Sequence, residues 1–203
     1  MSSSIMDLNL TSVRDQTVYL TKGVLQNDDQ QLTSLAPGQK IVLQHGRLRQ
    51  EATIQFRAAG ECFIGMFEMN AALAKKMRLL DYKRYRLVHD PNNDVVRIDA
   101  APVSVASGMH RHSPRLRGQT ISIGYQLQSQ LGIPDIRGYA VTVKSGDAVR
   151  KMFVGTPSNL FDHEMQTAPG TGKALRLAPG KSYGLRYDQR TRTLTILGPT
   201  GRA

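Results

Sequence analysis

The sequence predicts a mainly β protein with short helices, folded as two tandem, pseudo-symmetric small β-barrels. Apolar and polar residues alternate with a period of two in many short runs, as in half-buried strands. Glycine, proline, asparagine and aspartate separate these runs, as they do in turns. Residues of like kind recur at an offset of about one hundred along the 203-residue chain, which indicates a duplication.

The clearest unit is the stretch from Gly118 to Gly146. It begins with the β-type run Thr120 to Ile123 and continues with the amphipathic run Tyr125 to Leu131, which predicts a short helix. Gly132-Ile133 then suits a helix end, where glycine adopts the left-handed conformation and the next residue makes an apolar contact. The alternating run Ala140 to Val143 predicts the second strand.

The first half holds two similar units in a more degraded form. After a polar leader, the first unit predicts strands at Val18 to Leu20, Lys40 to Gln44 and Ala52 to Phe56. We expect its polar stretch, Gln26 to Gln31, to be a turn or a frayed helix.

The second unit opens with a predicted strand from Cys62 to Met66. Asn70 suits the N-cap of a helix whose buried side chains are Leu73, Ala74 and Met77. A hairpin follows, in which Tyr85, Leu87 and His89 share one face, Asp90 to Asn93 form the turn and Val95 to Ile98 return.

We divide the chain into a first barrel module at residues 1–103, a basic linker at residues 104–117 and a second barrel module at residues 118–203. The linker is rich in small residues and in histidine and arginine, so we expect it to be exposed and flexible. Gly155 to Gly172 is expected to be the longest irregular region and a mobile loop. Leu175 to Pro199 is the fourth unit.

The duplication is visible as two sets of corresponding residues. Gly38, Ile41, Leu43 and Gly46 correspond to Gly138, Val141, Val143 and Gly146. Lys75, Met77, Arg78, Leu79, Tyr85, Leu87, Asp90 and Ile98 correspond to Lys173, Leu175, Arg176, Leu177, Tyr183, Leu185, Asp188 and Ile196. Each half is therefore predicted to hold two strand–helix–strand–turn–strand units, which interlock into a barrel without exposed edges.

One position differs among the helices. Arg78 and Arg176 occupy the place that Gly132 has at the end of its helix. A residue with a Cβ costs roughly 1 kcal/mol in the left-handed conformation. We therefore expect those two helices to end differently.

The formal net charge of +11 favours an interaction with polyanions such as nucleic acid. The 27 lysines and arginines are scattered, without a run of five or more like charges. If a polyanion is bound, we expect phosphate contacts from seven residues, namely Arg47, Arg49, Lys75, Lys76, Arg78, Arg115 and Arg117.

The single cysteine, Cys62, excludes an intramolecular disulfide and a thiolate zinc cluster. The first residues lack the charged and apolar regions of a secretion signal, and no run of about 18 apolar residues occurs. We expect a cytoplasmic protein.

The sequence resembles two groups of known proteins. The unit order in Gly118 to Gly146 and in Leu73 to Ile98 is similar to the swapped-hairpin and double-psi barrel units of AbrB-type regulators. YRLVHDPNNDVVRI and YGLRYDQRTRTLTILGP, with GRLRQEATIQF upstream, resemble the N-terminal module of the YheC/YheD family of endospore coat-associated proteins. The resemblance implies a spore-associated location and, for the family, an ATP-grasp domain after Gly198-Pro199. This chain ends at Ala203, so no nucleotide site is expected.

No convergent set of catalytic residues is evident. Asp162-His163-Glu164 is the best acid–base candidate, but neighbours in sequence point apart, and we expect a solvated loop. His110 and His112 lack a third ligand, so no metal site is predicted. Gly170 to Lys173 lacks the first glycine and the final hydroxyl residue of a phosphate loop, and no Gly-Ser step for self-cleavage occurs.

We therefore predict a non-enzymatic structural or binding protein with no catalytic residues, no cofactor and no metal. A protein partner is expected, bound through the linker, the long loop or a barrel rim. The alternative is an AbrB-like DNA-binding regulator, in which the seven basic residues contact phosphate.

Overall fold

The computed structural model describes residues 2–12, 16–21, 32, 34–58, 65–155 and 163–200. The chain divides into two compact units, Met1–Ala101 and Pro102–Ala203. The predictions for Gln26 to Gln31, Cys62 to Ile64 and Asp162 lie outside the described residues. Within the described ranges, no helix has the length and apolar composition to cross a membrane.

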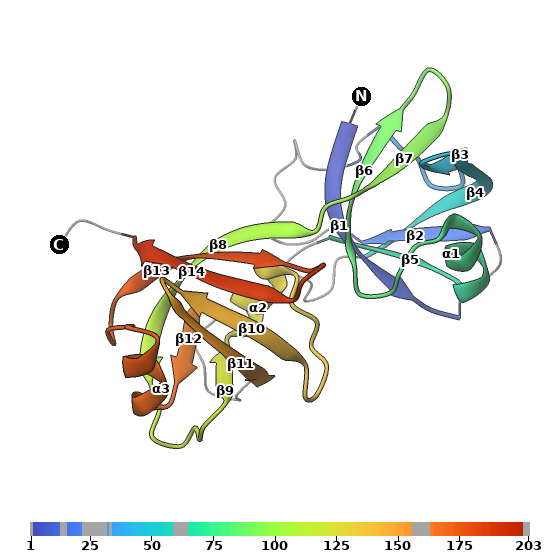
Figure 1. Cartoon of the computed structure of the whole chain (residues 1–203). Coiled ribbons are helices and arrows are strands. Elements are labelled where there is room, and N and C mark those ends of the chain that lie inside the picture. The colour runs from blue at the N-terminus through green and yellow to red at the C-terminus, as the bar shows by residue number, and fades with distance from the viewer. Residues whose placement is uncertain are drawn as a thin grey trace. The chain divides into compact units, whose positions relative to one another are not determined.

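The first unit is a closed barrel of the seven strands that the structure describes in it (Figure 1). Its elements are β1 (Ser2–Leu10), β2 (Thr17–Thr21), β3 (Lys40–His45), β4 (Leu48–Arg57), β5 (Gly65–Met69), α1 (Ala71–Met77), β6 (Arg84–Asp90) and β7 (Val95–Ala100). The strand order around the barrel is β1-β5-β2-β4-β3-β7-β6. The pairs β1–β5, β2–β4 and β3–β7 are parallel, and the other four are antiparallel.

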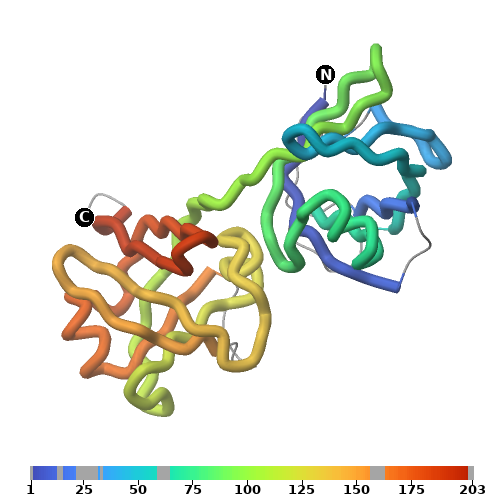
Figure 2. The backbone as a smooth tube through the Cα atoms, turned by 45° about the vertical axis from the view of Figure 1, so that its right-hand side comes forward, coloured from blue at the N-terminus to red at the C-terminus, as the bar shows by residue number. Residues whose placement is uncertain are grey.

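The second unit is a closed barrel of the same kind. Its elements are β8 (Val103–His112), β9 (Thr120–Ile123), α2 (Tyr125–Leu131), β10 (Ala140–Ser145), β11 (Ala148–Gly155), β12 (Glu164–Thr167), α3 (Pro169–Ala174), β13 (Ser182–Asp188) and β14 (Thr193–Pro199). Counted from β8, the strand order is β8-β12-β9-β11-β10-β14-β13, which repeats the first barrel strand for strand. Each half closes on itself in the tube view of Figure 2. The predicted fold class, two tandem small barrels, is confirmed.

Left-handed backbone conformations occur at matching places in the two barrels. The pairs are Gly38 and Gly138, Gly46 and Gly146, Arg78 and Arg176, Tyr82 and Gly180, and Asp94 and Arg192. Because a left-handed residue sets the direction of a turn, the described turns of one barrel repeat those of the other. This agreement supports the internal repeat.

The core of each barrel consists of inward-facing residues of its own strands together with apolar residues of its helices and connecting segments. Tyr85 and Tyr183 are each only 5% exposed. Their hydroxyl oxygens accept hydrogen bonds from the backbone N–H groups of Leu80 at 2.9 Å and Ala178 at 2.8 Å. The two tyrosines are therefore equivalent core residues and offer no ring face for stacking.

The helix that begins after Asn70 is confirmed. The Asn70 side-chain oxygen accepts a hydrogen bond from the Leu73 N–H at 2.7 Å, and the buried face holds Leu73, Ala74 and Met77. This N-cap satisfies one of the backbone donors that a helix start leaves without a partner.

The prediction that the helices before Arg78 and Arg176 end differently from the helix before Gly132 is wrong. Arg78 and Arg176 take φ values of 54° and 56°, close to the 67° of Gly132. The following residues, Leu79, Leu177 and Ile133, are buried and donate equivalent hydrogen bonds back to Ala74, Gly172 and Gln128. Burial of this apolar side chain offsets the roughly 1 kcal/mol cost of the left-handed arginine.

The predicted linker at residues 104–117 is wrong for most of its length. Val103–His112 forms the long strand β8, which pairs with β12 and β13 inside the second barrel. Its inward positions carry Ser104, Gly108 and His110, whereas Val103 and Val105 face solvent. In this strand small and polar residues are buried and valines are exposed, the opposite of the usual pattern. The sequence pattern therefore favours an irregular segment.

Two other segments are also more regular than predicted. The polar leader forms β1, the first-barrel counterpart of β8, with Met6 and Leu8 facing the core. Of the expected mobile loop Gly155 to Gly172, residues 156–162 lie outside the described residues, and the rest contains β12 and most of α3. Both segments have regular structure because barrel closure needs β1 and β12 as pairing partners for their neighbours.

Candidate functional site

The seven basic residues predicted to bind polyanions divide between the two units. Arg47 lies at the β3–β4 turn, Arg49 on β4, and Lys75, Lys76 and Arg78 at the end of α1, whereas Arg115 and Arg117 follow β8. All seven side chains are exposed, and none forms an ion pair with an acidic group in the described part of the chain. The set is therefore accessible but is spread over two units.

The two barrels differ strongly in formal charge. Residues 102–203 contain 14 lysines and arginines and 5 acidic residues, a formal charge of +9. Residues 1–101 contain 13 lysines and arginines and 11 acidic residues, a formal charge of +2. Two barrels of the same topology thus differ by seven charges, so the excess is not a requirement of the fold.

Few of the cations in the second barrel are neutralised within it. Glu164 accepts from Arg111 and Asp188 accepts from Arg190. The other exposed cations of the barrel form no ion pair within the described ranges; they are Arg115, Arg117, Arg137, Lys144, Arg150, Lys151, Lys173, Arg176, Lys181, Arg186 and Arg192. The positive field of this barrel therefore extends into solvent.

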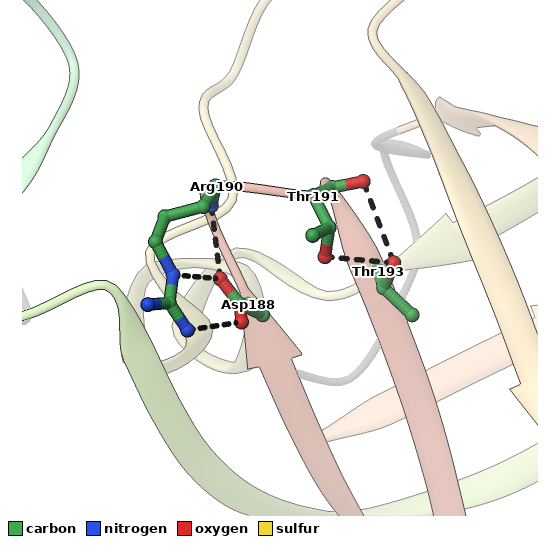
Figure 3. A network of polar contacts seen from close by, with 4 residues as sticks. All are labelled: Asp188, Arg190, Thr191 and Thr193. Atoms are coloured by element: carbon green, nitrogen blue, oxygen red, sulfur yellow. Dashed lines mark hydrogen bonds and ion pairs between the residues drawn. The ribbon is translucent and has the colours of Figure 1, made fainter.

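The β13–β14 turn shows how one of the acidic groups is held (Figure 3). The Arg190 guanidinium donates to both carboxylate oxygens of Asp188, at 3.2 Å from Nε and 2.9 Å from Nη2. These hydrogen bonds lower the pKa of Asp188 to about 2. The Thr191 hydroxyl donates to the Thr193 hydroxyl at 2.9 Å in the same turn. Asp188 therefore stays ionised and paired with Arg190.

The interior of the second barrel contains a polar cluster that the first barrel lacks. Strand registers and helix-end hydrogen bonds place Leu8, Leu10, Met69 and Ala74 of the first barrel at the positions of His110, His112, Thr167 and Gly172 in the second. His110 and Thr167 are fully buried. The His-x-His pair is therefore part of the barrel interior, contrary to the predicted exposed linker.

Hydrogen bonds fix the tautomer of the neutral His110 ring. Its Nδ1 lies 3.3 Å from the carbonyl oxygen of Ala178, and its Nε2 lies 3.0 Å from the Thr167 hydroxyl. Because a carbonyl only accepts, Nδ1 carries the hydrogen and Nε2 accepts from Thr167. Burial lowers the pKa of His110. Both nitrogens of the neutral ring are thus occupied, and His110 is not a free general base.

His112 packs against a helix glycine. Its ring lies 5.2 Å from that of His110, and its Nε2 is buried without a hydrogen-bond partner in the described structure. A Cβ at Gly172 would lie 2.5 Å from this nitrogen. Gly172 therefore leaves the space that the His112 ring fills.

We expect this cluster to make the second barrel sensitive to acid. A histidine held neutral in the fold resists a proton that the unfolded chain accepts, so stability falls as pH drops below the ordinary pKa of 6.5. His110→Leu, which restores the first-barrel residue, should reduce the slope of unfolding free energy against pH by up to about 1.4 kcal/mol per pH unit. Urea unfolding of the parent chain and the variant, at the chosen values of about pH 7.5, 6.5 and 5.5, measures this slope. An unchanged slope in the variant contradicts the prediction.

The acid–base candidate around His163 is not brought together. His163 is exposed, whereas Glu164 is 5% exposed in β12 and paired with Arg111. The prediction of a solvated loop is therefore wrong for Glu164, because the inward turn of β12 buries it. Within the described residues, no three histidine, cysteine, aspartate or glutamate side chains lie close enough to share a metal ion.

The first barrel has a shallow depression of about 410 Å³ on its outer sheet surface. It is lined by Gln44, Arg49, Val88, Asp90, Asn93, Val95 and Arg97. Of the seven predicted basic residues, Arg49 alone lines it, and Asp90 and Arg97 balance each other in charge. The charged residues that line the depression therefore sum to one positive charge, that of Arg49, which is too little to select anions.

Comparison of the chain with protein-family models, with curated proteins and with solved structures finds no match. The resemblance to the YheC/YheD family and to AbrB-type regulators therefore stays a prediction.

Proposed function

We propose that this chain is a non-enzymatic binding protein whose second barrel binds a polyanionic partner, nucleic acid in particular. The observation that carries the proposal is the difference between +9 and +2 in formal charge on two copies of one barrel. Like charges repel one another in the folded state, so such an excess opposes stability and favours a partner that neutralises it.

The resemblance to endospore coat-associated proteins favours a structural role with a protein partner. The AbrB-like alternative is a DNA-binding role, and the charge difference between the barrels favours this second role. A duplex carries one negative charge per about 1.7 Å of its axis, and a basic barrel gains free energy by releasing the counterions. We therefore place nucleic acid before an unidentified protein as the partner.

Three of the described histidines, His45, His89 and His110, are engaged in hydrogen bonds within the barrels. His110 is neutral and bonded at both ring nitrogens, and His45 Nδ1 lies 2.8 Å from the Met77 carbonyl oxygen. His89 is fully buried, with Nδ1 2.7 Å from the Ser34 hydroxyl. These three rings therefore form hydrogen bonds within their own barrels.

The proposal predicts binding to DNA that weakens steeply with salt. The full chain should bind a labelled duplex of about 20 base pairs at about 50 mM salt, measured by fluorescence anisotropy. With about four phosphate contacts, affinity should fall roughly 100-fold between about 50 and 200 mM salt. Absence of binding at the lower salt concentration contradicts the proposal, and a salt-independent affinity contradicts its electrostatic basis.

A further inference from the structure

Four neighbouring strands of the second barrel present one outer surface made of threonines and cations. Cross-strand pairs in β11, β10, β14 and β13 place Lys151 beside Thr142, Thr142 beside Thr193, Lys144 beside Thr195, and Thr195 beside Arg186. Because paired residues point to the same side of a sheet, these six residues share a surface, here called the basic sheet face. The alternate residues, such as Val143, Leu185 and Ile196, are buried in the core.

The basic sheet face is open to solvent and lacks an unpaired acid. Lys144, Lys151 and Arg186 are exposed and form no ion pair within the described structure. The carboxylate of Asp188, on the outer side of β13, is already held by Arg190. Lys144 and Arg186 lie two strands apart, a separation of roughly 10 Å at the usual strand spacing.

The first barrel supplies an internal comparison. The same registers place Val42, Gln44, Glu51, Val88, Val95 and Arg97 at the positions of Thr142, Lys144, Lys151, Arg186, Thr193 and Thr195. Glu51 and Arg97 cancel, and Arg97 is in addition paired with Asp99 at 2.8 Å. One surface of one fold is thus neutral in the first barrel and carries three positive charges in the second.

We infer that the basic sheet face is the surface that contacts the phosphate backbone of a nucleic-acid duplex, an assignment that rests on the proposed function. Lysine and arginine provide charge, and the hydroxyls of Thr142 and Thr195 can donate hydrogen bonds to phosphate oxygens. The Thr193 hydroxyl is bonded to Thr191. Single strands are favoured by several exposed aromatic rings. Among the outward-facing residues described on these four strands, Phe153 is the one exposed aromatic, at 44%.

This assignment differs from the set predicted from the sequence. Arg47, Arg49, Lys75, Lys76 and Arg78 belong to the nearly neutral first unit, whose cations are matched by almost as many acids. Lys144, Lys151 and Arg186 are far apart in sequence and are brought together only by the pairing of β10 with β11 and β14 and of β14 with β13.

An exchange between the two barrels tests the assignment. The exchange variant, Lys144→Gln, Lys151→Glu and Arg186→Val, gives the second barrel the residues that the first barrel has at the same registers. It lowers the formal charge by four, from +11 to +7. Two other variants change the charge equally: Lys40→Glu with Arg86→Glu, on exposed strand positions of the first barrel, and Lys75→Glu with Lys76→Glu, on α1.

We expect the exchange variant to bind the duplex more than about tenfold more weakly than the parent chain. The magnitude of its log–log salt slope should fall by about three, one for each lost phosphate contact. The two control variants should lose much less affinity, because they change only the long-range field. A thermal melt of each variant confirms folding, and Lys144→Gln with Arg186→Gln serves as a milder pair if the exchange variant melts early.

The outcomes separate the two proposals. If the parent chain fails to bind, the proposed function is wrong and the assignment falls with it. Equal loss in all three variants, or a larger loss in the α1 variant, leaves nucleic-acid binding intact and overturns the assignment. Tighter binding of polyglutamate than of the duplex, with the same variant sensitive, assigns the face to an acidic protein and overturns the choice of nucleic acid.

Discussion

Asp7→Ala is expected to destabilise the first barrel by about 3 kcal/mol, because it removes the carboxylate that accepts two hydrogen bonds from a buried guanidinium. The Arg84 side chain is 4% exposed and donates to Asp7 Oδ1 from Nε and to Oδ2 from Nη2, both at 2.8 Å. The two residues lie opposite each other on β1 and β6. Urea unfolding followed by far-UV circular dichroism measures the loss.

The second barrel provides the control for this prediction. Met109 and Ser182 occupy the positions of Asp7 and Arg84 on β8 and β13, so that barrel closes without an ion pair here. The double variant Asp7→Met with Arg84→Ser should therefore be more stable than Asp7→Met alone, by at least about 1 kcal/mol. Additive losses in the double variant would show that the two residues act independently.

Gly108→Ala is expected to cost about 2 kcal/mol in the second barrel. The added Cβ would lie 2.6 Å from Leu127 Cδ2 and 3.2 Å from the backbone oxygen of His163, where α2 packs on β8. The His163 oxygen is fixed because it accepts a hydrogen bond from the Met109 N–H at 2.9 Å. Overpacking costs about 1–3 kcal/mol, which exceeds the gain of about 0.4–1 kcal/mol from a stiffer unfolded chain.

Gly155→Ala in the same barrel is the matched control. Its Cβ would meet Thr120 Cγ2 at 3.5 Å and Ser122 Oγ at 3.6 Å, which are ordinary contacts. We expect this variant to be neutral or slightly stabilised in urea unfolding, because only the unfolded-state entropy changes. Equal losses in Gly108→Ala and Gly155→Ala would contradict the packing argument.

The parts of the fold that follow from local patterns were predictable from the sequence. Asn70 with its buried stripe gives α1, and the alternation of Tyr183, Leu185 and Tyr187 gives β13. The hundred-residue offset gives the duplication, which the two strand orders repeat. In these elements the apolar residues are the buried ones, so their spacing along the sequence indicates whether the segment is a helix or a strand.

The strand β8 was missed for a physical reason, whereas β1 does carry an alternation, with Met6 and Leu8 facing the core. In β8 the inward residues are small or polar, and His110 is satisfied by Thr167 and Ala178 from elsewhere in the barrel. A buried polar residue with distant partners leaves no hydrophobic alternation in its own segment. The partners become visible only when the strands pair, so one sequence without coordinates favours a flexible linker.

The candidate site was missed for a related reason. Lys144, Lys151 and Arg186 are single cations within strands, separated in sequence by up to 42 residues, and no local run marks them. The seven residues selected from the sequence are clusters of neighbours, such as Lys75 and Lys76. What could have indicated the basic sheet face is the charge of each half taken separately, +2 against +9.

The most direct test is a titration of the isotope-labelled full chain with a DNA duplex, monitored through the backbone amide resonances. The account predicts that the largest shifts fall on the strands β10, β11, β13 and β14, and that the equivalent strands β3, β4, β6 and β7 shift little. Shifts concentrated at the end of α1 or at the β3–β4 turn, or no shifts at low salt, would contradict it.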